Sequence, residues 1–377
     1  FQLEGVGMRR FIKELKPTNF SDIAAMVALY RPGPMEHIPT FIKAKHGIEP
    51  IQYPHPALSQ ILEETYGVIV YQDQVLLIVQ TFAGYTLGEA DVVRKAMGKK
   101  IPQTMKQERQ RVITGAKRRG FSKELAEGVF NLIEPFAGYA FNKAHSVSYA
   151  MIAYQTAYLK ANYPAEYMTA FLISNTGQLE KIAPTVAECR RLGIPVLPPD
   201  VNRSGVTFAI EKDDEHGTSA IRFGLADIKN VGTAAVNPII TARQDGGTFK
   251  SIEDFCKRVD LRGINKRVLE SLIKVGVMDY LGDRGALLYS IDRILSLSQR
   301  EQRLRETGQT TMFDLWGKNV PLPMAALELA DVAVPLNERL AWEKELLGAY
   351  VSEHPFGNAA RRLVSDTITL CGQIDAE

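Results

Sequence analysis

The sequence predicts a mainly α-helical protein with one small β element, and three observations lead to this prediction. Apolar residues recur at helical spacing through the first half of the chain, as at Val75, Ile78 and Val79. Clusters of Gly and Pro interrupt these stretches, beginning with Pro32–Pro34. Before the last few residues of the chain, the alternating pattern that is typical of strands is confined to one short stretch after Pro195.

The elements follow one another in a simple order. Helical spacing continues to Pro195, after which Val206–Ile210, an acidic turn and Ala220–Leu225 predict a β-hairpin of modest length. From Ile228 to about Leu297 the pattern is helical again, with two turns that contain glycine. The hairpin therefore separates two helical regions.

The C-terminal part is less regular. Ser298–Pro323 is polar and rich in turn residues, and a helix follows from about Leu340 to Leu347. The last stretch, Thr367–Ile374, alternates like the first strand of a further domain. Because the chain begins with Phe1 and stops at this strand pattern, we expect it to be a piece of a longer protein.

Length and composition exclude several classes of protein. A chain of 377 residues is long enough for two or three domains, and 45% hydrophobic with 23% charged residues excludes a mainly disordered or collagen-like chain. No apolar run approaches the ~20 residues that cross a membrane. The three cysteines, Cys189, Cys256 and Cys371, lie far apart, which disfavours a disulfide framework or a zinc site and fits a cytoplasmic location.

The net charge of +2 conceals one strongly basic segment. Between Arg94 and Arg119 there are ten basic residues and a single acid, Glu108, so this segment carries +9 and the rest of the chain −7. One interpretation is a solvated helix whose last turn carries cations that suit its dipole. The other, which we favour, is that phosphate groups neutralise the segment, because ten cations with one acid repel one another.

A second polar cluster, Phe141–Ser146, precedes an apolar helix that runs to about Asn162. Asn142 or Ser146 can cap that helix, and free backbone N–H groups beside Lys143 would make an anion site. The alternative is that a histidine near a helix start is an ordinary hydrogen-bonded residue.

Two glycine-containing turns have the layout of helix-hairpin-helix motifs. Ile228–Val236 has a tight hydrophobic-Gly turn between predicted helices, and Leu261–Val268 repeats a looser version. In such motifs backbone amides bind DNA phosphates without reading bases. Both turns depart from the usual double glycine, so helix pairs that only pack together remain the alternative.

Gln309–Phe313 lies in the polar segment and not in a periodic element. Exposed Met312 and Phe313 beside Gln309 suggest a docking peptide, with one directional hydrogen bond and two apolar anchors. The alternative is that these side chains fold back on their own domain.

Five motifs carry a resemblance to a known family, and they stand in the order Arg31–Met35, Tyr71–Val75, Asp91–Lys100, Phe141–Tyr149 and Tyr154–Ala157. With this order and spacing the chain closely resembles the α subunit of bacterial DNA polymerase III, a C-family replicative polymerase. The resemblance implies a fingers domain over 1–231, with the β-hairpin as an appendage at about 195–226. It also implies a tandem helix-hairpin-helix and sliding-clamp-binding region over 232–340, and a linker with the start of a truncated OB-fold over 341–377.

The motifs and the resemblance together assign three sets of residues. The set expected at the incoming nucleotide triphosphate is Arg94, Lys95, Asn142, Lys143, His145 and Ser146. The set expected at DNA is Lys99, Lys100, Arg118, Arg119, Val231, Gly232, Gly263, Lys266 and Arg267. The set expected at the sliding clamp is Gln309, Met312 and Phe313. Lys95 replaces the second arginine that is common in the family, and so loses bidentate geometry. Asp73 stands where the family commonly has Glu.

The resemblance also implies what this chain lacks. The family's catalytic aspartates bind magnesium in a palm domain that precedes the fingers, so no catalytic or metal-binding residue is expected here, and the isolated chain is expected to be inactive. The implied partners are primer–template DNA, deoxynucleoside triphosphates, the sliding clamp and other replicase subunits. A non-catalytic DNA or clamp adaptor is the main alternative. A metabolic phosphotransferase ranks last, because the sequence has no glycine-rich Walker loop.

Overall fold

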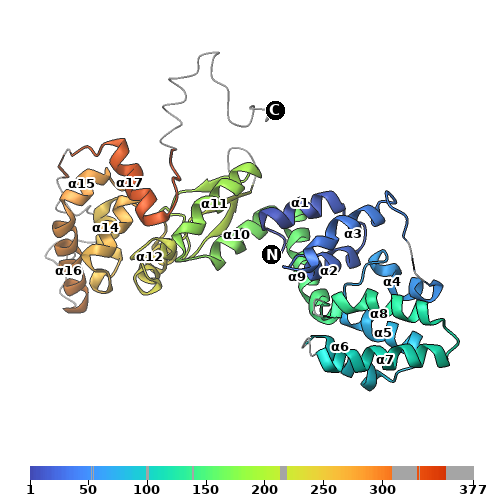
Figure 1. Ribbon diagram of the computed structural model, residues 1–377. Coiled ribbons are helices and arrows are strands. Elements are labelled where there is room, and N and C mark those ends of the chain that lie inside the picture. Colours follow the sequence, from blue (N-terminus) through green and yellow to red (C-terminus); the bar gives the residue numbers. More distant parts are fainter. Residues whose placement is uncertain are drawn as a thin grey trace, which may run out of the picture. The chain divides into compact units, whose positions relative to one another are not determined.

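The protein is described here by a computed structural model, in which residues 1–51, 53, 55–98, 102–137, 140–212, 219–307, 329–330 and 332–353 are described. The chain divides into two compact units, Phe1–Ala161 and Asn162–Glu377 (Figure 1). We call them the N-terminal and C-terminal units and describe each by itself.

Helices form the N-terminal unit, together with one isolated β-bridge between Tyr71 and Phe141. The elements are α1 (Val6–Leu15), α2 (Phe20–Leu29), η1 (Pro34–His37), α3 (Ile38–Lys45), η2 (Pro56–Leu58), α4 (Ser59–Leu62), η3 (Glu63–Thr65), α5 (Gln72–Ala83), α6 (Leu87–Gly98), α7 (Pro102–Arg118), α8 (Lys123–Ala137) and α9 (Lys143–Asn162). The prediction of an α-helical first half is confirmed.

The helices α5 to α8 pack around one hydrophobic core (Figure 1). The predicted apolar positions Val75, Ile78 and Val79 are all buried there, beside Phe82. α5 and α7 approach so closely that a Cβ on Gly115 would lie 2.4 Å from the carbonyl oxygen of Ala83. The absence of a side chain at this glycine therefore sets the distance between the two helices.

The other helices of this unit form two smaller clusters. α1, α2 and α3 bury residues such as Leu15, Met26 and Phe41 against the extended segment that precedes α5. α9 packs on α2 through small side chains, with Ala150 in contact with the cluster that contains Ala24. Small residues let the two helices come close together, but they leave most of the surface of α9 uncovered.

A buried glutamine fixes the segment that leads into α5. The carboxamide oxygen of Gln74 accepts hydrogen bonds from the backbone N–H groups of Val70 (2.8 Å) and Tyr71 (2.9 Å). Its amide nitrogen donates to the Thr65 hydroxyl (2.7 Å) and to the Ile61 carbonyl (3.3 Å). All four hydrogen bonds of the side chain are therefore made inside the protein.

A buried carboxylate, Asp22, closes the first turn of α2. Asn19 and Asp22 form a capping box, and the carboxylate accepts further hydrogen bonds from Thr18 N–H (2.9 Å) and Tyr66 (2.8 Å) and pairs with Lys45 (3.2 Å). Burial acts to raise the pKa of Asp22, but these interactions outweigh it and hold that pKa below its usual value.

The C-terminal unit combines a small sheet with a helical region. Its elements are α10 (Pro164–Ser174), α11 (Leu179–Arg191), β1 (Val196–Leu197), β2 (Ala209–Lys212), β3 (Ser219–Arg222), η4 (Leu225–Asp227), α12 (Thr233–Gly246), α13 (Ile252–Arg258), η5 (Leu261–Gly263), α14 (Lys266–Lys274), α15 (Arg284–Tyr289), α16 (Ile291–Thr307) and α17 (Leu336–Leu347). One continuous core of buried residues runs through them.

The predicted β-hairpin is present, and the sheet has one more strand than expected. β2 pairs antiparallel with β3, and β1 joins the other edge of β3 in parallel, with Val196 opposite Ile221. Leu197 also accepts a hydrogen bond from Phe223 N–H (3.1 Å). A strand of two residues is too short to show an alternating pattern, so it is recognised only by its pairing with β3.

The first predicted helix-hairpin-helix differs from expectation on its N-terminal side, where a short 3₁₀ turn, η4, takes the place of a helix. The N–H groups of Leu225 and Ala226 donate to the carbonyls of Gly205 (3.0 Å) and Val206 (2.9 Å). These donors are paired with a neighbouring segment, and the turn ends after three residues. The second motif has a helix on each side, α13 and α14, with η5 between them.

α17 is fixed to the helical region by a buried glutamate. Glu343 is 1% exposed, accepts hydrogen bonds from the N–H groups of Val351 and Ser352 (3.1 Å each) and lies 3.7 Å from Arg284. Arg284 also pairs with Asp279 (2.8 Å). The stretch after α17 is thereby held against α15. The predicted OB-fold start lies almost wholly outside the described residues.

The two compact units meet at residues 161 and 162, whereas the predicted fingers domain ends at residue 231. A compact unit and a domain defined by family resemblance need not coincide, because α10, α11 and the sheet share the core of the helices that follow. The boundaries at 231 and 340 stay predictions.

Replacement of Gly115 by alanine should destabilise the N-terminal unit. The new Cβ would clash with the Ala83 carbonyl, so we expect the free energy of unfolding to fall by about 1–3 kcal/mol in urea titrations. Gly128→Ala in α8 is the matched control, since a Cβ there meets no atom within 4 Å. The control should gain up to ~1 kcal/mol from helix propensity. Equal effects of the two changes would contradict the close approach of α5 and α7.

The stability of the N-terminal unit should depend on pH through Asp22. Because the folded pKa of Asp22 is lowered, its contribution is present above the unfolded pKa of about 3.9 and is lost as the pH falls through the folded pKa. Asp22→Asn should lower the free energy of unfolding by roughly 2 kcal/mol at pH 7. Urea titrations should show this difference shrinking below about pH 4. A difference that is the same at pH 7 and at pH 3 would contradict the argument.

Candidate functional site

The β-bridge between Tyr71 and Phe141 brings the starts of α5 and α9 together. Phe141 N–H donates to the Val70 carbonyl (3.0 Å), and Gln72 N–H donates to the Phe141 carbonyl (2.9 Å). Two sequence motifs that lie about seventy residues apart thereby become neighbours. The polar cluster before α9 is consequently placed at the first turn of α5.

Gln72 connects this pair of segments to the basic helix α6. Its amide nitrogen donates to the Ala140 carbonyl (3.2 Å), and its carboxamide oxygen accepts a hydrogen bond from Arg94 Nη1 (3.4 Å). The structure thus brings Arg94 to the segment that leads into Asn142 and Lys143. Gln72 was not among the predicted site residues, although it belongs to one of the motifs that carry the resemblance.

Arg94 and Lys95 share one carboxylate, that of Asp91. The guanidinium of Arg94 lies 2.7 Å and the ammonium of Lys95 lies 2.8 Å from its oxygens. The hydrogen bonds from Lys95 and Arg94 hold the pKa of Asp91 below its ordinary value. The i,i+3 and i,i+4 spacing of these residues is visible in the sequence and is the signal that could have identified Asp91.

The start of α9 presents one cation and one capped turn. Asn142 is the capping residue, since its side-chain oxygen accepts a hydrogen bond from His145 N–H (3.2 Å). Lys143 pairs with Glu64 (2.5 Å), and its ammonium lies 5.5 Å from the centre of the Tyr71 ring. Glu64 lies far away in sequence, so no local pattern could have indicated it.

Ser146 is the one predicted triphosphate residue that does not face the surface. It is 0% exposed, and its hydroxyl donates to the Lys143 carbonyl (3.1 Å). Asn142, and not Ser146, therefore caps α9. The burial of Ser146 follows from its place on the face of α9 that packs against the rest of the unit.

Aromatic rings and a second arginine surround this start of α9. The exposed imidazole of His145 lies between the rings of Phe141 (5.3 Å) and Tyr149 (4.5 Å). The guanidinium of Arg31 lies 4.1 Å from the centre of the Phe141 ring, and burial lowers the pKa of Arg31. Arg31 was not predicted as a site residue, although it opens the first motif of the resemblance. We call Arg31, Gln72, Arg94, Lys143 and His145 the α9 cluster.

Several cations of the basic segment are neutralised by acids that lie outside it in sequence. Besides the two on Asp91, Arg109 pairs with Glu134 (3.7 Å) and Arg111 pairs with Glu89. The argument from repulsion between ten cations is therefore weaker than the count suggests. Lys99 and Lys100 lie outside the described residues.

Arg118 and Arg119 stand at the end of α7, beside the end of α5. A Cβ on Gly84 would lie 3.3 Å from Arg119, so this arginine packs on the turn that ends α5. Arg118 lines a cavity that Ala83, Gly84 and Tyr85 of the same turn also line. Both side chains are exposed.

The first glycine turn is held in place by its backbone and by one asparagine. Lys229 N–H donates to the Leu346 carbonyl (2.9 Å), and Asn230, at φ 72°, donates from its side chain to Ser271 (3.3 Å). Val231 is buried, whereas Gly232 is exposed and caps α12 without a side chain. The first N–H groups of α12 are therefore left without a side-chain cap.

The second glycine turn carries more charge. Gly263 is exposed and closes η5, and Lys266 pairs with Asp292 (2.8 Å). Asn265 caps α14 through a hydrogen bond from Val268 N–H (2.9 Å). Arg267 is exposed, and within the described part of the chain it has no acidic partner. Of the predicted cations at this turn, Arg267 is thus the more available for an anion.

Other predicted features fall outside what the structure describes or find no counterpart in it. Gln309, Met312 and Phe313 lie outside the described residues. Within the described ranges, no three His, Cys, Asp or Glu side chains come together in a way that could hold a metal ion. The resemblance places the magnesium on a palm domain outside this chain, and no metal-binding residue was predicted here. No described helix is both long enough and apolar enough to cross a bilayer.

Comparison with known families matches two parts of the chain. Residues 1–120 match the family described as bacterial DNA polymerase III alpha subunit finger domain. Residues 193–287 match the helix-hairpin-helix motif, a range that includes both glycine turns. The predicted fold class, helical fingers followed by a helix-hairpin-helix region, is confirmed.

The chain is also similar along nearly its whole length to curated proteins. It is 46% identical to DNA polymerase III subunit alpha of Thermus aquaticus, over 94% of this chain and 28% of that protein. It is 42% identical to the subunit of Vibrio cholerae and 41% identical to that of Escherichia coli K12, over 97% and 96% of this chain and 32% of each relative. The resemblance indicated by the motifs is confirmed, and the chain spans about three tenths of the length of these relatives.

Proposed function

We propose that this chain is the fingers and helix-hairpin-helix part of a replicative DNA-directed DNA polymerase. In that role it positions the incoming deoxynucleoside triphosphate and binds the backbone of primer–template DNA. The observation that carries the proposal is the contact chain Arg94–Gln72–Phe141, which joins the basic helix α6 to the capped start of α9. Similarity to DNA polymerase III alpha subunits over nearly the whole chain supports the same function.

The α9 cluster has the chemistry that a triphosphate requires. Arg94 offers a planar fork of donors to phosphate oxygens and Lys143 offers a point charge, to which Lys95, next to the cluster, adds a second. The N-terminus of α9 adds the positive end of a helix dipole beside Lys143. His145, exposed between two rings, can touch the nucleotide, whereas Ser146 acts only by holding the first turn of α9.

An anion that binds here competes with carboxylates already in place. Asp91 neutralises Arg94 and Lys95, and Glu64 neutralises Lys143. A triphosphate carries several negative charges and can take these cations from single carboxylates by charge alone. Polymerisation itself needs magnesium held by aspartates of a palm domain, so we propose that the isolated chain binds nucleotide but does not extend a primer.

The glycine turns of the C-terminal unit would bind DNA without regard to its sequence. The uncapped N–H groups of α12 at Gly232 and the exposed side chain of Arg267 can each meet a backbone phosphate. Lys266 first has to leave Asp292. We propose that residues 1–231 form the fingers, 232–340 the helix-hairpin-helix and clamp-binding region, and 341–377 a linker with the start of an OB-fold.

The remaining partners follow from the same proposal. Gln309, Met312 and Phe313 would dock on the sliding clamp, as a short peptide with two apolar anchors. The chain would then act in the cytoplasm with the other subunits of a replicase.

Arg94→Ala should weaken the binding of a deoxynucleoside triphosphate by about tenfold or more, because charge-assisted hydrogen bonds are lost. Isothermal titration calorimetry with the 377-residue chain measures this. Arg94→Lys should fall between, since it keeps the charge without the fork. Lys123→Ala, a paired cation on α8, is the control and should bind like the parent chain. A parent chain that binds no triphosphate, or an Arg94→Ala variant that binds it equally well, would overturn the proposal.

Replacement of both Gln309 and Phe313 by alanine should abolish binding to a sliding clamp in a surface-binding assay. These changes remove the directional hydrogen bond and one apolar anchor, and each buried anchor contributes ~1.5–3 kcal/mol. Thr310→Ala, inside the same segment, is the control and should bind normally. Undiminished binding by the double variant would place the docking site elsewhere in the chain.

A further inference from the structure

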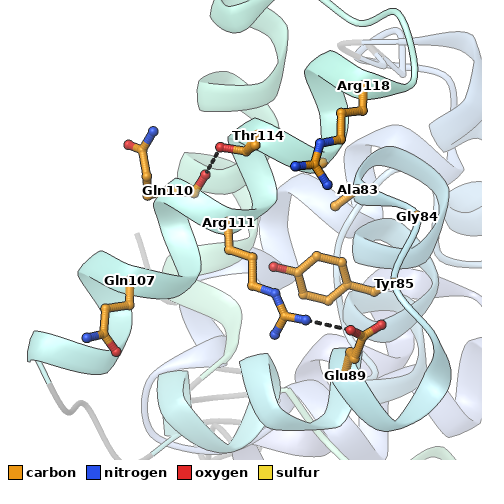
Figure 2. A pocket seen from close by; sticks show the side chains of 10 residues that line it. Ala83, Gly84, Tyr85, Glu89, Gln107, Gln110, Arg111, Thr114 and Arg118 are labelled. Carbon is orange, nitrogen blue, oxygen red and sulfur yellow. Dashed lines mark hydrogen bonds and ion pairs between the residues drawn. The ribbon is translucent and has the colours of Figure 1, made fainter.

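A cavity of about 650 Å³ lies beside α7, at the turn that joins α5 to α6 (Figure 2). The helix contributes Gln107, Gln110, Arg111, Thr114 and Arg118, whose spacing places them on one face. All five are exposed, so the cavity is a groove along the surface of the helix. We call it the α7 groove. Eleven residues of helix rise give it a length of ~16 Å, more than one phosphate group needs.

Hydrogen-bond donors dominate the α7 groove. Two carboxamides and two guanidinium groups offer N–H donors, and the Thr114 hydroxyl donates to the Gln110 carbonyl (2.8 Å). The acid that lines the groove, Glu89, is already engaged by Thr86 N–H (2.9 Å), by the Thr86 hydroxyl (3.0 Å) and by Arg111. Its oxygens therefore add little repulsion toward an anion.

The uncompensated charge of the groove comes from Arg118. Arg111 pairs with Glu89, as the dashed line in Figure 2 shows, and also lies 3.9 Å from the buried Glu108, whereas Arg118 has no acidic partner within the described part of the chain. The lining side chains consequently sum to a single positive charge. One phosphodiester carries one negative charge, while a free triphosphate carries several. The charge of the groove thus suits the backbone of a nucleic acid better than a free nucleotide.

Arg111 also provides a surface on which a base can stack. Its guanidinium lies 4.9 Å from the centre of the buried Tyr85 ring, and its side chain is 49% exposed. The guanidinium therefore lies against the Tyr85 ring and is also open to solvent. Arginine planes stack on bases that are not paired, because paired bases expose only their edges.

We propose that the α7 groove binds a short single-stranded segment of nucleic acid. Arg118 binds a phosphodiester, Gln107, Gln110 and Thr114 line the path of the strand, and Arg111 stacks on a base. A cavity of this volume accommodates one drug-sized group, which corresponds to one or two nucleotides. The inference rests on the proposed function for the source of the strand, but its residues are separate from the α9 cluster.

The test is fluorescence anisotropy with a labelled oligothymidylate of about twelve nucleotides. Arg118→Ala should weaken its binding to the 377-residue chain by about tenfold, the loss of one charge-assisted contact. Arg118→Lys should recover part of it. Lys117→Ala is the matched control, because it removes one positive charge from the same helix. The Lys117 side chain interacts electrostatically with Glu124, and it does not line the groove. It should weaken binding no more than about twofold.

Three results would overturn the proposal. The first is equal loss of binding in Arg118→Ala and Lys117→Ala. The second is equal affinity for an oligonucleotide with neutral methylphosphonate linkages, which removes the charge that Arg118 needs. The third is that Arg118→Ala weakens the binding of a duplex, or the competition by inorganic pyrophosphate, as strongly as it weakens the binding of the single strand.

Failure of the groove can be told apart from failure of the proposed function. Arg118→Ala should leave the affinity for a triphosphate unchanged, and Arg94→Ala should leave that for the oligonucleotide unchanged within about twofold. If triphosphate binding depends on Arg94 and oligonucleotide binding does not depend on Arg118, only the proposal for the groove is refuted. The reverse pattern would refute the nucleotide site and leave the groove intact.

Discussion

The four hydrogen bonds of Gln74 hold the segment on which the candidate site is built. They pair two backbone N–H groups, of Val70 and Tyr71, in a buried place where each unpaired group would cost about 1–3 kcal/mol. With that segment fixed, Tyr71 can bridge to Phe141, and the first turns of α5 and α9 become neighbours. The contacts of Gln72 with Arg94 and Ala140 follow from the same placement.

Helical periodicity predicted most of the fold, because the apolar residues that a helix buries recur at helical spacing in its own sequence. What the sequence did not show depends on partners far along the chain. β1 is defined by its pairing with β3, where Val196 lies opposite Ile221, and at η4 the N–H groups of Leu225 and Ala226 donate to residues of an earlier segment. Elements of two or three residues carry no period, so only the assembled fold defines them.

The sequence predicted some residues of the candidate site. The others have in common that their contacts are made only by the fold. Arg94 and Lys143 were predicted to bind a polyanion, but their carboxylate partners were not predicted. A count of charges along the sequence misses acids that the fold brings in, such as Glu64 and Glu89. The α7 groove was missed because its second wall, Ala83–Tyr85 and Glu89, lies beside α7 only in the fold, although the polar face of α7 itself follows from helical spacing.

The sharing of Asp91 by Arg94 and Lys95 has a consequence for ligand selection. A ligand must displace the Asp91 carboxylate before it can pair with these cations. Only a ligand with more negative charge than one carboxylate therefore gains binding free energy here. A group with one negative charge gains nothing over Asp91, whereas a chain of phosphates does. In the proposed complex, the displaced Asp91 would remain beside the phosphates and repel them. In the proposed function, the side chain that keeps weaker anions out would thus also hasten the departure of any product that carries less charge than the ligand that entered.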